Sequence, residues 1–449
     1  MDDSQSCRRS IRFSEDNDLM APLYDEKLKL DFSNHLVQLR KGNPDEIARF
    51  MRYFQINSPE KLLTAITSEQ NFHAFLKEAI LSDNDFSQFN GLYVISLITN
   101  TDEDFSFLID PQILTFLLQK INDDYYGYRL IALTIINNLL IQYRNTYDFF
   151  SQMNLANQLK FIADFRSESN NEEYMEAFKR KEMILDEISY TIYIITKEDK
   201  NTNTKLFKIE EAPILWDTLL FLFDQYDDTT LRRRIIGSMA NIISAGFIGQ
   251  ISESMMDFFS WVVIDSMDLL TAFSYFVTCL PKIDDFFTEL IRRGILDNMA
   301  EVIERDSDQN PEEIYRMLGE IRFATDNQDF MALTLKKLKG PAKYYTRVEI
   351  VYYLSRIIYP TSTALIQLLM NHDVFLDITE IMSSEEAEVV HFCLDFIYNV
   401  LDCYTKAFQK KASTFPSANI IETDLSEMVS KIDDEADEKI RIILEKFDE

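Results

Sequence analysis

The stretch RLIALTIINNLLIQ, residues 129–142, places two adjacent asparagines inside an otherwise almost wholly apolar run. Its apolar residues recur at helical spacing, which predicts a helix. A buried amide without hydrogen-bond partners costs a few kcal/mol, so Asn137 and Asn138 each need a partner. Two kinds of partner are open: a ligand in a groove, or a neighbouring helix of the same protein.

The same helical spacing continues on both sides of this stretch. From Asp31 to the end of the chain, apolar residues recur at i, i+3 and i+4, and short polar breaks such as SDND, YDDTT and LKGPAK separate the runs. No segment alternates like a β-strand. The chain has only 9 glycines, which are scarce for a nucleotide-binding or β-rich fold. These features predict an all-α protein.

The apolar helices also repeat along the chain. Similar helices begin near residues 93, 134, 190, 237, 271, 316, 352 and 395, a mean period of about 43 residues that is typical of armadillo and HEAT repeats. A chain of 449 residues is too long to fold around one ordinary hydrophobic core, whereas an array of repeats can reach this length. We therefore predict a flexible tail over 1–30 and an armadillo/HEAT-like α-solenoid of about nine to ten repeats over 31–449.

Two segments interrupt or end the predicted array. A polar insertion lies near 166–180, and an acidic terminal repeat spans 422–449. The whole chain has a formal charge of −30, which repels nucleic acid and anionic membranes and attracts basic partners. Against this acidity, LRRRII (231–236) holds three successive arginines. We expect these arginines to form ion pairs with acids of YDDTT or of a neighbouring repeat.

Signatures of catalysis and of metal binding are missing. The sequence has no GxSxG, Walker loop, HExxH or CxxC, and its 4 cysteines and 4 histidines are scattered. We therefore expect no enzyme activity, no cofactor and no metal. The polar start MDDSQSCRRS and the lack of a long apolar run predict neither a signal peptide nor a membrane span. The expected location is the cytoplasm and nucleus.

Three stretches carry a resemblance to a known family. LRRRIIGSMANIISAGFIG (231–249) is similar to the innermost helix of the importin-alpha armadillo repeat. The segment from Arg347 to Leu401 resembles consecutive late repeats, and the segment from Ala418 to Glu449 resembles the last one. The chain is thus identified as a divergent member of the importin-alpha family, and this resemblance implies a right-handed solenoid.

The resemblance also implies a peptide-binding groove. In this family, groove asparagines bind the main chain of an extended peptide, and a tryptophan one helical turn earlier stacks on a lysine stem. Carried over position by position, the family pattern gives these groove candidates: Tyr93, Thr134, Asn138, Tyr190, Gly237, Asn241, Tyr352 and Arg356. None of the positions at which the family has its lysine-stacking tryptophan holds a tryptophan in this chain. At the asparagine positions, Leu97 and Ile194 replace two of the asparagines, and Arg356 replaces a third.

Two functions follow from the resemblance. The first is an importin-alpha-like adaptor that binds basic, extended nuclear-localisation-type peptides for protein import into the nucleus. The alternative is an armadillo scaffold for protein–protein interaction that has lost this binding. Importin-beta is a doubtful partner because the arginine-rich N-terminal segment is missing. Acids beside Asn138 and Asn241 with exposed Tyr93 and Tyr190 favour the adaptor, whereas a groove lined by Leu97, Ile194 and buried tyrosines favours the scaffold.

Overall fold

The fold is all helical wherever it is described. The computed structural model describes residues 70–83, 85–100, 104–164, 173–199, 204–265, 267–281, 283–305, 311–323, 327–340, 342–358, 363–383, 386–429 and 434–448. Within these ranges every named element is a helix, and the one β contact is an isolated bridge between Asp199 and Thr204. The predicted all-α, solenoid-like fold is confirmed, while the number of repeats and their handedness stay predictions.

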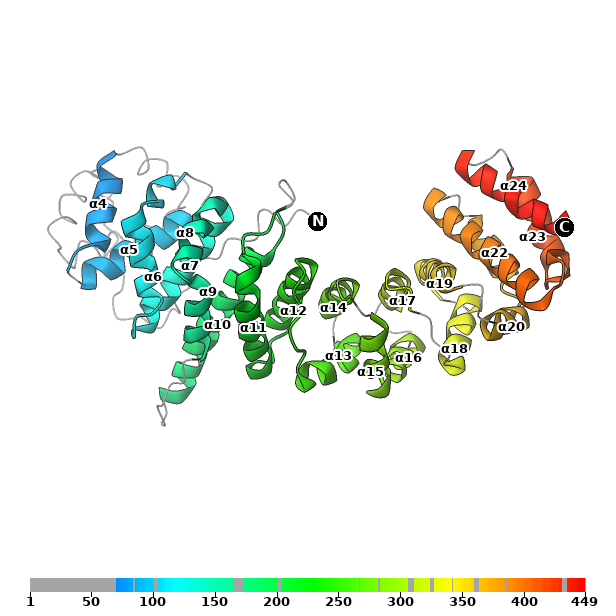
Figure 1. Cartoon of the computed structure of the whole chain (residues 1–449), viewed down its shortest axis with the longest axis horizontal. Coiled ribbons are helices and arrows are strands. Elements are labelled where there is room, and N and C mark those ends of the chain that lie inside the picture. Colours follow the sequence, from blue (N-terminus) through cyan, green and yellow to red (C-terminus); the bar gives the residue numbers. More distant parts are fainter. Residues whose placement is uncertain are drawn as a thin grey trace, which may run out of the picture. The chain divides into compact units, whose positions relative to one another are not determined.

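The chain separates into two compact units, Met1–Gly249 and Gln250–Glu449 (Figure 1). The first unit contains α4 Gln70–Ile80, α5 Asp85–Thr99, η2 Ser106–Leu108, α6 Pro111–Lys120, α7 Tyr126–Gln142, η3 Arg144–Thr146, α8 Tyr147–Gln152, α9 Leu155–Asp164, α10 Glu173–Thr196, η4 Ile209–Glu211, α11 Ala212–Gln225 and α12 Thr229–Ser244. The predicted tail, 1–30, and the residues 31–69 lie outside the described part of the chain. The polar insertion is described only from 173 on, where it forms the start of α10.

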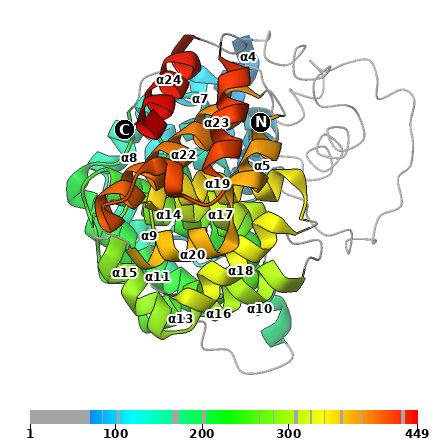
Figure 2. The same ribbon diagram turned by 90° about the vertical axis from the view of Figure 1, so that its right-hand side faces the viewer.

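The second unit contains α13 Glu253–Asp265, α14 Met267–Thr278, α15 Ile283–Arg292, α16 Ile295–Arg305, α17 Pro311–Glu320, α18 Gln328–Lys339, α19 Tyr344–Ile357, α20 Thr363–His372, α21 Phe375–Met382, α22 Ala387–Phe408, η5 Ala412–Thr414, α23 Ala418–Met428 and α24 Asp434–Asp448. Figures 1 and 2 both show α13, α16 and α18 on one side of this unit and α14, α17 and α19 on the other.

Each unit has a row of helices that pack side by side. In the first unit α5, α7, α10 and α12 contact one another in this order, and we call them the α7 row. In the second unit α14, α17, α19, α22 and α24 do the same, and we call them the α19 row. Each row helix also packs against a helix beside it in sequence, such as α6 on α7 or α18 on α19. Such stacked helix pairs are the building plan of an α-solenoid.

Local sequence sets where these helices begin and end. The Asp110 carboxylate accepts the N–H of Gln112 at 2.8 Å, and Pro111 follows as the first helical residue of α6. Asp228 caps α12 in the same way. Gly246 ends α12 with φ +99°, a left-handed conformation that costs glycine least.

The core of the first unit is centred on α7. Every residue of this helix from Gly127 to Leu140 is buried, including both asparagines. Apolar residues on all sides of a helix are typical of a fully buried one. The quoted stretch therefore lies between the neighbouring helices of its row, and its polar side chains must find partners there.

Candidate functional site

The two asparagines of α7 point to opposite neighbours in the α7 row. The Asn137 amide nitrogen donates to Glu187 Oε2 of α10 at 2.7 Å, and Glu187 is itself buried. The Asn138 amide nitrogen donates to Thr99 Oγ1 of α5 at 3.1 Å. These amide N–H groups therefore tie α7 to the row helix on each side of it.

The amide oxygens of the same two residues are not satisfied. Asn137 Oδ1 and Asn138 Oδ1 are buried and accept no hydrogen bond from the part of the chain that the structure describes. A buried acceptor without a donor is costly, and such groups in native proteins commonly mark a bound water or a ligand. This is the one property of Asn138 that fits peptide recognition.

Three further candidates of the first unit, Thr134, Tyr93 and Tyr190, are buried. The Thr134 hydroxyl donates to the carbonyl oxygen of Leu130 in its own helix at 3.0 Å, so it is occupied by the backbone. Tyr93 is 5% exposed and Tyr190 is 7% exposed. Ile194, which stands where the family places an asparagine, is buried as well, and the side chain of Leu97 lies outside what the structure describes.

The Tyr190 ring already has a cation of the chain itself beside it. The Arg234 guanidinium of α12 lies 5.3 Å from the centre of this ring. Its Nη1 is also 2.5 Å from Asp186 Oδ1 of α10. The Tyr190 ring and the Asp186 carboxylate could together bind a basic side chain of a peptide. Arg234, which belongs to the same row, already occupies that position.

Gly237 and Asn241 lie farther along α12. Gly237 is half-buried, and a Cβ added there would approach only the Tyr193 ring, at 4.0 Å. Asn241 is buried, and its carbonyl oxygen accepts a hydrogen bond from Lys205 Nζ at 2.6 Å. This lysine places a positive charge at the C-terminal end of α12, where a helix favours one.

The last two candidates, Tyr352 and Arg356, lie in the second unit on α19. The Tyr352 ring is half-buried and packs on Phe392 of α22 at 4.9 Å between ring centres. The Arg356 guanidinium lies 5.4 Å from the Tyr352 ring centre. As with Tyr190, the chain's own cation lies beside the ring. Asn399 of α22 donates to the carbonyl oxygen of Ser355 at 3.3 Å, another tie between row helices.

Arg232 and Arg234 of LRRRII form the expected ion pairs. Arg232 Nη1 is 2.5 Å from Asp227 Oδ1 in the YDDTT break, and Arg234 pairs with Asp186 of the neighbouring row helix. The prediction of ion pairs with those two sets of acids is confirmed. The sequence did not predict that Arg234 also lies beside an aromatic ring, that of Tyr190. For Tyr352 and Arg356 a signal existed, because residues four apart share a helix face.

The same arrangement recurs at the end of the α19 row. Lys446 of α24 lies 4.7 Å from the centre of the Tyr398 ring of α22, and its Nζ is 3.0 Å from Asp402 Oδ1. Nothing in the sequence singled out these residues, because they are far apart along the chain. In both units, an aromatic ring, a cation and a carboxylate thus form a contact that links neighbouring row helices.

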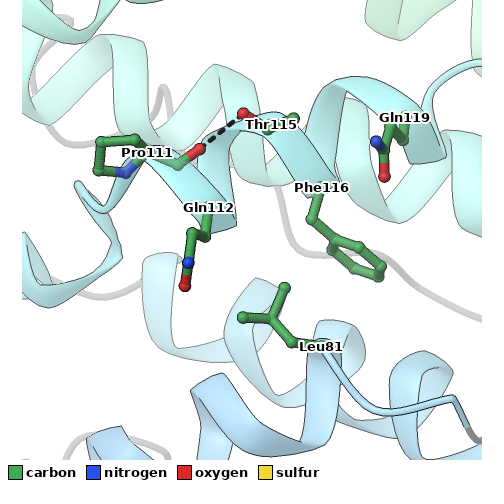
Figure 3. A pocket seen from close by; sticks show the side chains of 6 residues that line it. All are labelled: Leu81, Pro111, Gln112, Thr115, Phe116 and Gln119. Carbon is green, nitrogen blue, oxygen red and sulfur yellow. Dashed lines mark hydrogen bonds between the residues drawn. The ribbon is translucent and has the colours of Figure 1, made fainter.

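Among the described residues no group of three or more histidine, cysteine, aspartate or glutamate side chains is placed to hold a metal ion. No described helix is both long enough and apolar enough to cross a bilayer. A shallow hollow of about 490 Å³ lies between α6 and the end of α4, lined by Leu81, Pro111, Gln112, Thr115, Phe116 and Gln119 (Figure 3). We call it the α6 hollow.

Comparison with known proteins supports the fold alone. No family model and no curated protein sequence matches the chain. Among solved structures, the chain is similar to the crystal structure of an engineered protein that was a target of the Northeast Structural Genomics Consortium. The TM-score is 0.64 at 13% identity, and the likeness covers 92% of this chain and 98% of that one.

Proposed function

We propose that this chain is a helical-repeat scaffold that binds other proteins and that its α7 row does not bind nuclear-localisation-type peptides. The observation that carries the proposal is the burial of Tyr93, Tyr190 and Ile194. Buried tyrosines and an apolar residue at position 194 are two features expected of the scaffold. A peptide lysine cannot stack on a tyrosine ring that is 5–7% exposed unless the helices around it open.

The use of polar groups inside the protein supports the same proposal. The amide N–H groups of Asn137 and Asn138 bond to α10 and α5, and Arg234 and Arg356 lie beside two of the rings that a peptide lysine would need. A basic peptide would have to displace each of these internal contacts. Since a single contact of this kind contributes about 0.5–1.5 kcal/mol, the exchange brings little gain.

The expected partners are basic protein segments, because the chain carries a charge of −30. Nucleic acid, membranes and importin-beta are not proposed as partners. We propose no catalytic activity and no cofactor. We also propose a cytoplasmic and nuclear location.

The second candidate function is the importin-alpha-like adaptor. One observation favours it, namely that the buried amide oxygen of Asn138 accepts no hydrogen bond from the described residues. A peptide N–H is a donor that fits this acceptor. Access to it requires the α7 row to open, since Asn138 is 2% exposed.

Fluorescence polarisation with a labelled lysine-rich localisation peptide separates the two functions. The protein is compared with the double variant Asn138→Ala and Asn241→Ala at two salt concentrations. Asn298→Ala is the matched control, because Asn298 is also buried but donates to the carbonyl oxygen of Ser260 in the second unit.

The scaffold predicts that any binding is weak and indifferent to the two asparagines. Micromolar binding that weakens in the double variant and in salt, but not in Asn298→Ala, would establish the adaptor and overturn the scaffold. The double variant must retain the helical content of the parent protein, which circular dichroism checks.

A further inference from the structure

A cluster of aromatic rings lies where α5 meets the start of α7. Phe89, Tyr125 and Tyr128 are mutually in contact, with ring centres 5.5–5.8 Å apart and planes inclined by 61–81°. We call these three side chains the tyrosine cluster. Edge-to-face packing is a favourable arrangement for aromatic rings. Tyr128 is buried and Phe89 half-buried, whereas Tyr125 is 52% exposed, so Tyr125 is the ring that faces solvent.

The backbone at the start of α7 fixes the position of the tyrosine cluster. Gly127 lies beneath it, and a Cβ at this position would come within 2.7 Å of Tyr125 Cε1 and 3.1 Å of Phe89 Cε2. The N–H of Tyr125 donates to Asp123 Oδ1 at 3.0 Å, which fixes the turn before α7. The exposed ring of Tyr125 is therefore a positioned side chain and not a loosely attached one.

Carboxylates lie around the rings, while the nearby cations are turned inward. Asp85 and Asp124 are exposed, and the Tyr128 hydroxyl donates to the carbonyl oxygen of Asp85 at 2.7 Å. Burial, together with the charges of Asp85 and Asp123, raises the pKa of Tyr128 to about 12. Arg129 is buried and donates to the carbonyl oxygen of Asp123. The outward charge of this surface is thus negative.

Lys120 connects the tyrosine cluster to the α6 hollow. Its Nζ lies 3.9 Å from the centre of the Tyr128 ring and 5.5 Å from that of Phe116, which lines the hollow. The same nitrogen is 3.0 Å from Asp123 Oδ2, so its charge is neutralised locally. Figure 3 shows the Leu81 side chain, which is 38% exposed, on the side of the hollow that faces α6, below Gln112 and Phe116.

We propose that the tyrosine cluster and the α6 hollow form one docking surface for a basic protein segment that carries a large apolar side chain. The hollow receives the apolar side chain, and the exposed Tyr125 ring stacks on an arginine or lysine whose charge faces Asp85 and Asp124. This proposal rests on the proposed scaffold function and specifies a surface and a partner class for it. It lies outside the predicted groove, because none of the groove candidates belongs to it.

Three labelled peptides test the surface by fluorescence polarisation with the full chain. The probe is Gly-Arg-Arg-Leu-Arg-Arg-Gly, and the comparison peptides replace its leucine by glycine or its arginines by glutamate. The variants are Tyr125→Ala and Leu81→Ala. Their matched controls are Tyr345→Ala and Leu376→Ala, which remove side chains that are 68% and 46% exposed in the second unit.

We expect the probe to bind and each test variant to weaken it by about fivefold, with both controls unchanged. The leucine-to-glycine peptide should bind more weakly, the glutamate peptide should not bind, and raising NaCl from about 50 to about 300 mM should weaken the probe. No binding of the probe, or equal loss in test and control variants, overturns the docking surface and leaves the scaffold function standing.

A further arm keeps the two proposals distinguishable. If the probe binds but weakens in the double variant Asn138→Ala and Asn241→Ala and not in Tyr125→Ala, the basic segment occupies the α7 row. That result would overturn the docking surface and the scaffold function together.

Discussion

Asn137 and Asn138 are adjacent in sequence yet serve different helices. Asn137 donates to a buried carboxylate, whereas Asn138 donates to a threonine hydroxyl. A hydrogen bond to a charged group contributes more to stability than one between neutral groups, and a carboxylate that loses a donor in a buried position is costly. The two substitutions to alanine should therefore differ.

We expect Asn137→Ala to lower the free energy of unfolding by about 2–3 kcal/mol and Asn138→Ala by about 1 kcal/mol. Urea unfolding of the two variants under identical conditions measures the difference. A larger loss in Asn138→Ala would contradict the assignment of Glu187 as the partner of Asn137.

The sequence raised the question of these asparagines but left their direction open. A surface helix reveals its buried side by the spacing of its apolar residues. Because α7 is buried from Gly127 to Leu140, its apolar residues occupy every side and give no such direction. The partners Thr99 and Glu187 are 39 and 50 residues away from the amides, so only the packing of the helices shows them.

At the scale of the helix, row helices are linked by ion pairs as well as by the hydrogen bonds of the asparagines. Arg234 of α12 is 13% exposed and pairs with Asp186 of α10 beside the Tyr190 ring. Asp186 is 39% exposed, so one partner of this pair, Arg234, is well shielded. Lys160 and Asp217 link α9 to α11, which are not row helices, at 3.0 Å, and both side chains are more open, at 37% and 59% exposed. Exposed pairs contribute little because water and salt screen them.

A double-mutant cycle with Arg234→Met and Asp186→Asn should show a coupling of about 1 kcal/mol. The same cycle with Lys160→Met and Asp217→Asn should give a coupling near zero. Urea unfolding of the four proteins in each cycle provides the values. Equal couplings in the two cycles would show that burial does not distinguish these pairs.

The last pair of row helices should loosen in acid. Burial tends to raise the pKa of Asp402, but hydrogen bonds and charges of Lys406 and Lys446 outweigh it, so the pKa lies below its ordinary value. The ionised form of Asp402 therefore stabilises the fold above its unfolded-state pKa of about 4 and loses this effect as the pH falls through the lowered value.

We expect Asp402→Asn to speed amide hydrogen exchange in α24 at neutral pH, because Lys446 then loses its carboxylate partner in α22. The difference from the parent protein should shrink as the pH falls below about 4. Glu445→Gln, which removes an exposed acid of the same helix, should leave the exchange unchanged. A difference that persists in acid would rule out the ion pair as its cause.

Element-level features were more predictable than contacts. Turn and cap residues such as Asp110, Pro111 and Asp228 lie next to the helices that they start, so the sequence alone indicates those boundaries. The pairing of Arg232 with Asp227 could also be predicted, because acids precede LRRRII directly in YDDTT. That Arg234 lies beside Tyr190 could not be predicted, since this contact depends on how α12 packs on α10.

At the scale of the whole molecule, charge is the property that the sequence determines without the fold. The chain has 45 basic and 75 acidic residues. Many of the described bases pair with acids, as Arg293 does with Glu253, Asp257 and Glu289, and acids exceed bases by 30 along the chain. A folded chain holds these like charges closer together than an unfolded one does, and their repulsion lowers its stability.

We therefore expect added NaCl to raise the free energy of unfolding in urea, from about 20 mM up to about 300 mM, as the Debye length falls from roughly 20 Å to below 6 Å. Salt also weakens ion pairs such as Lys160–Asp217, but exposed pairs contribute at most about 1 kcal/mol each. Repulsion among a net 30 negative charges acts over the whole surface and should outweigh that loss. A fall in stability with salt would show the reverse, namely that the ion pairs between helices dominate the electrostatic free energy of this protein.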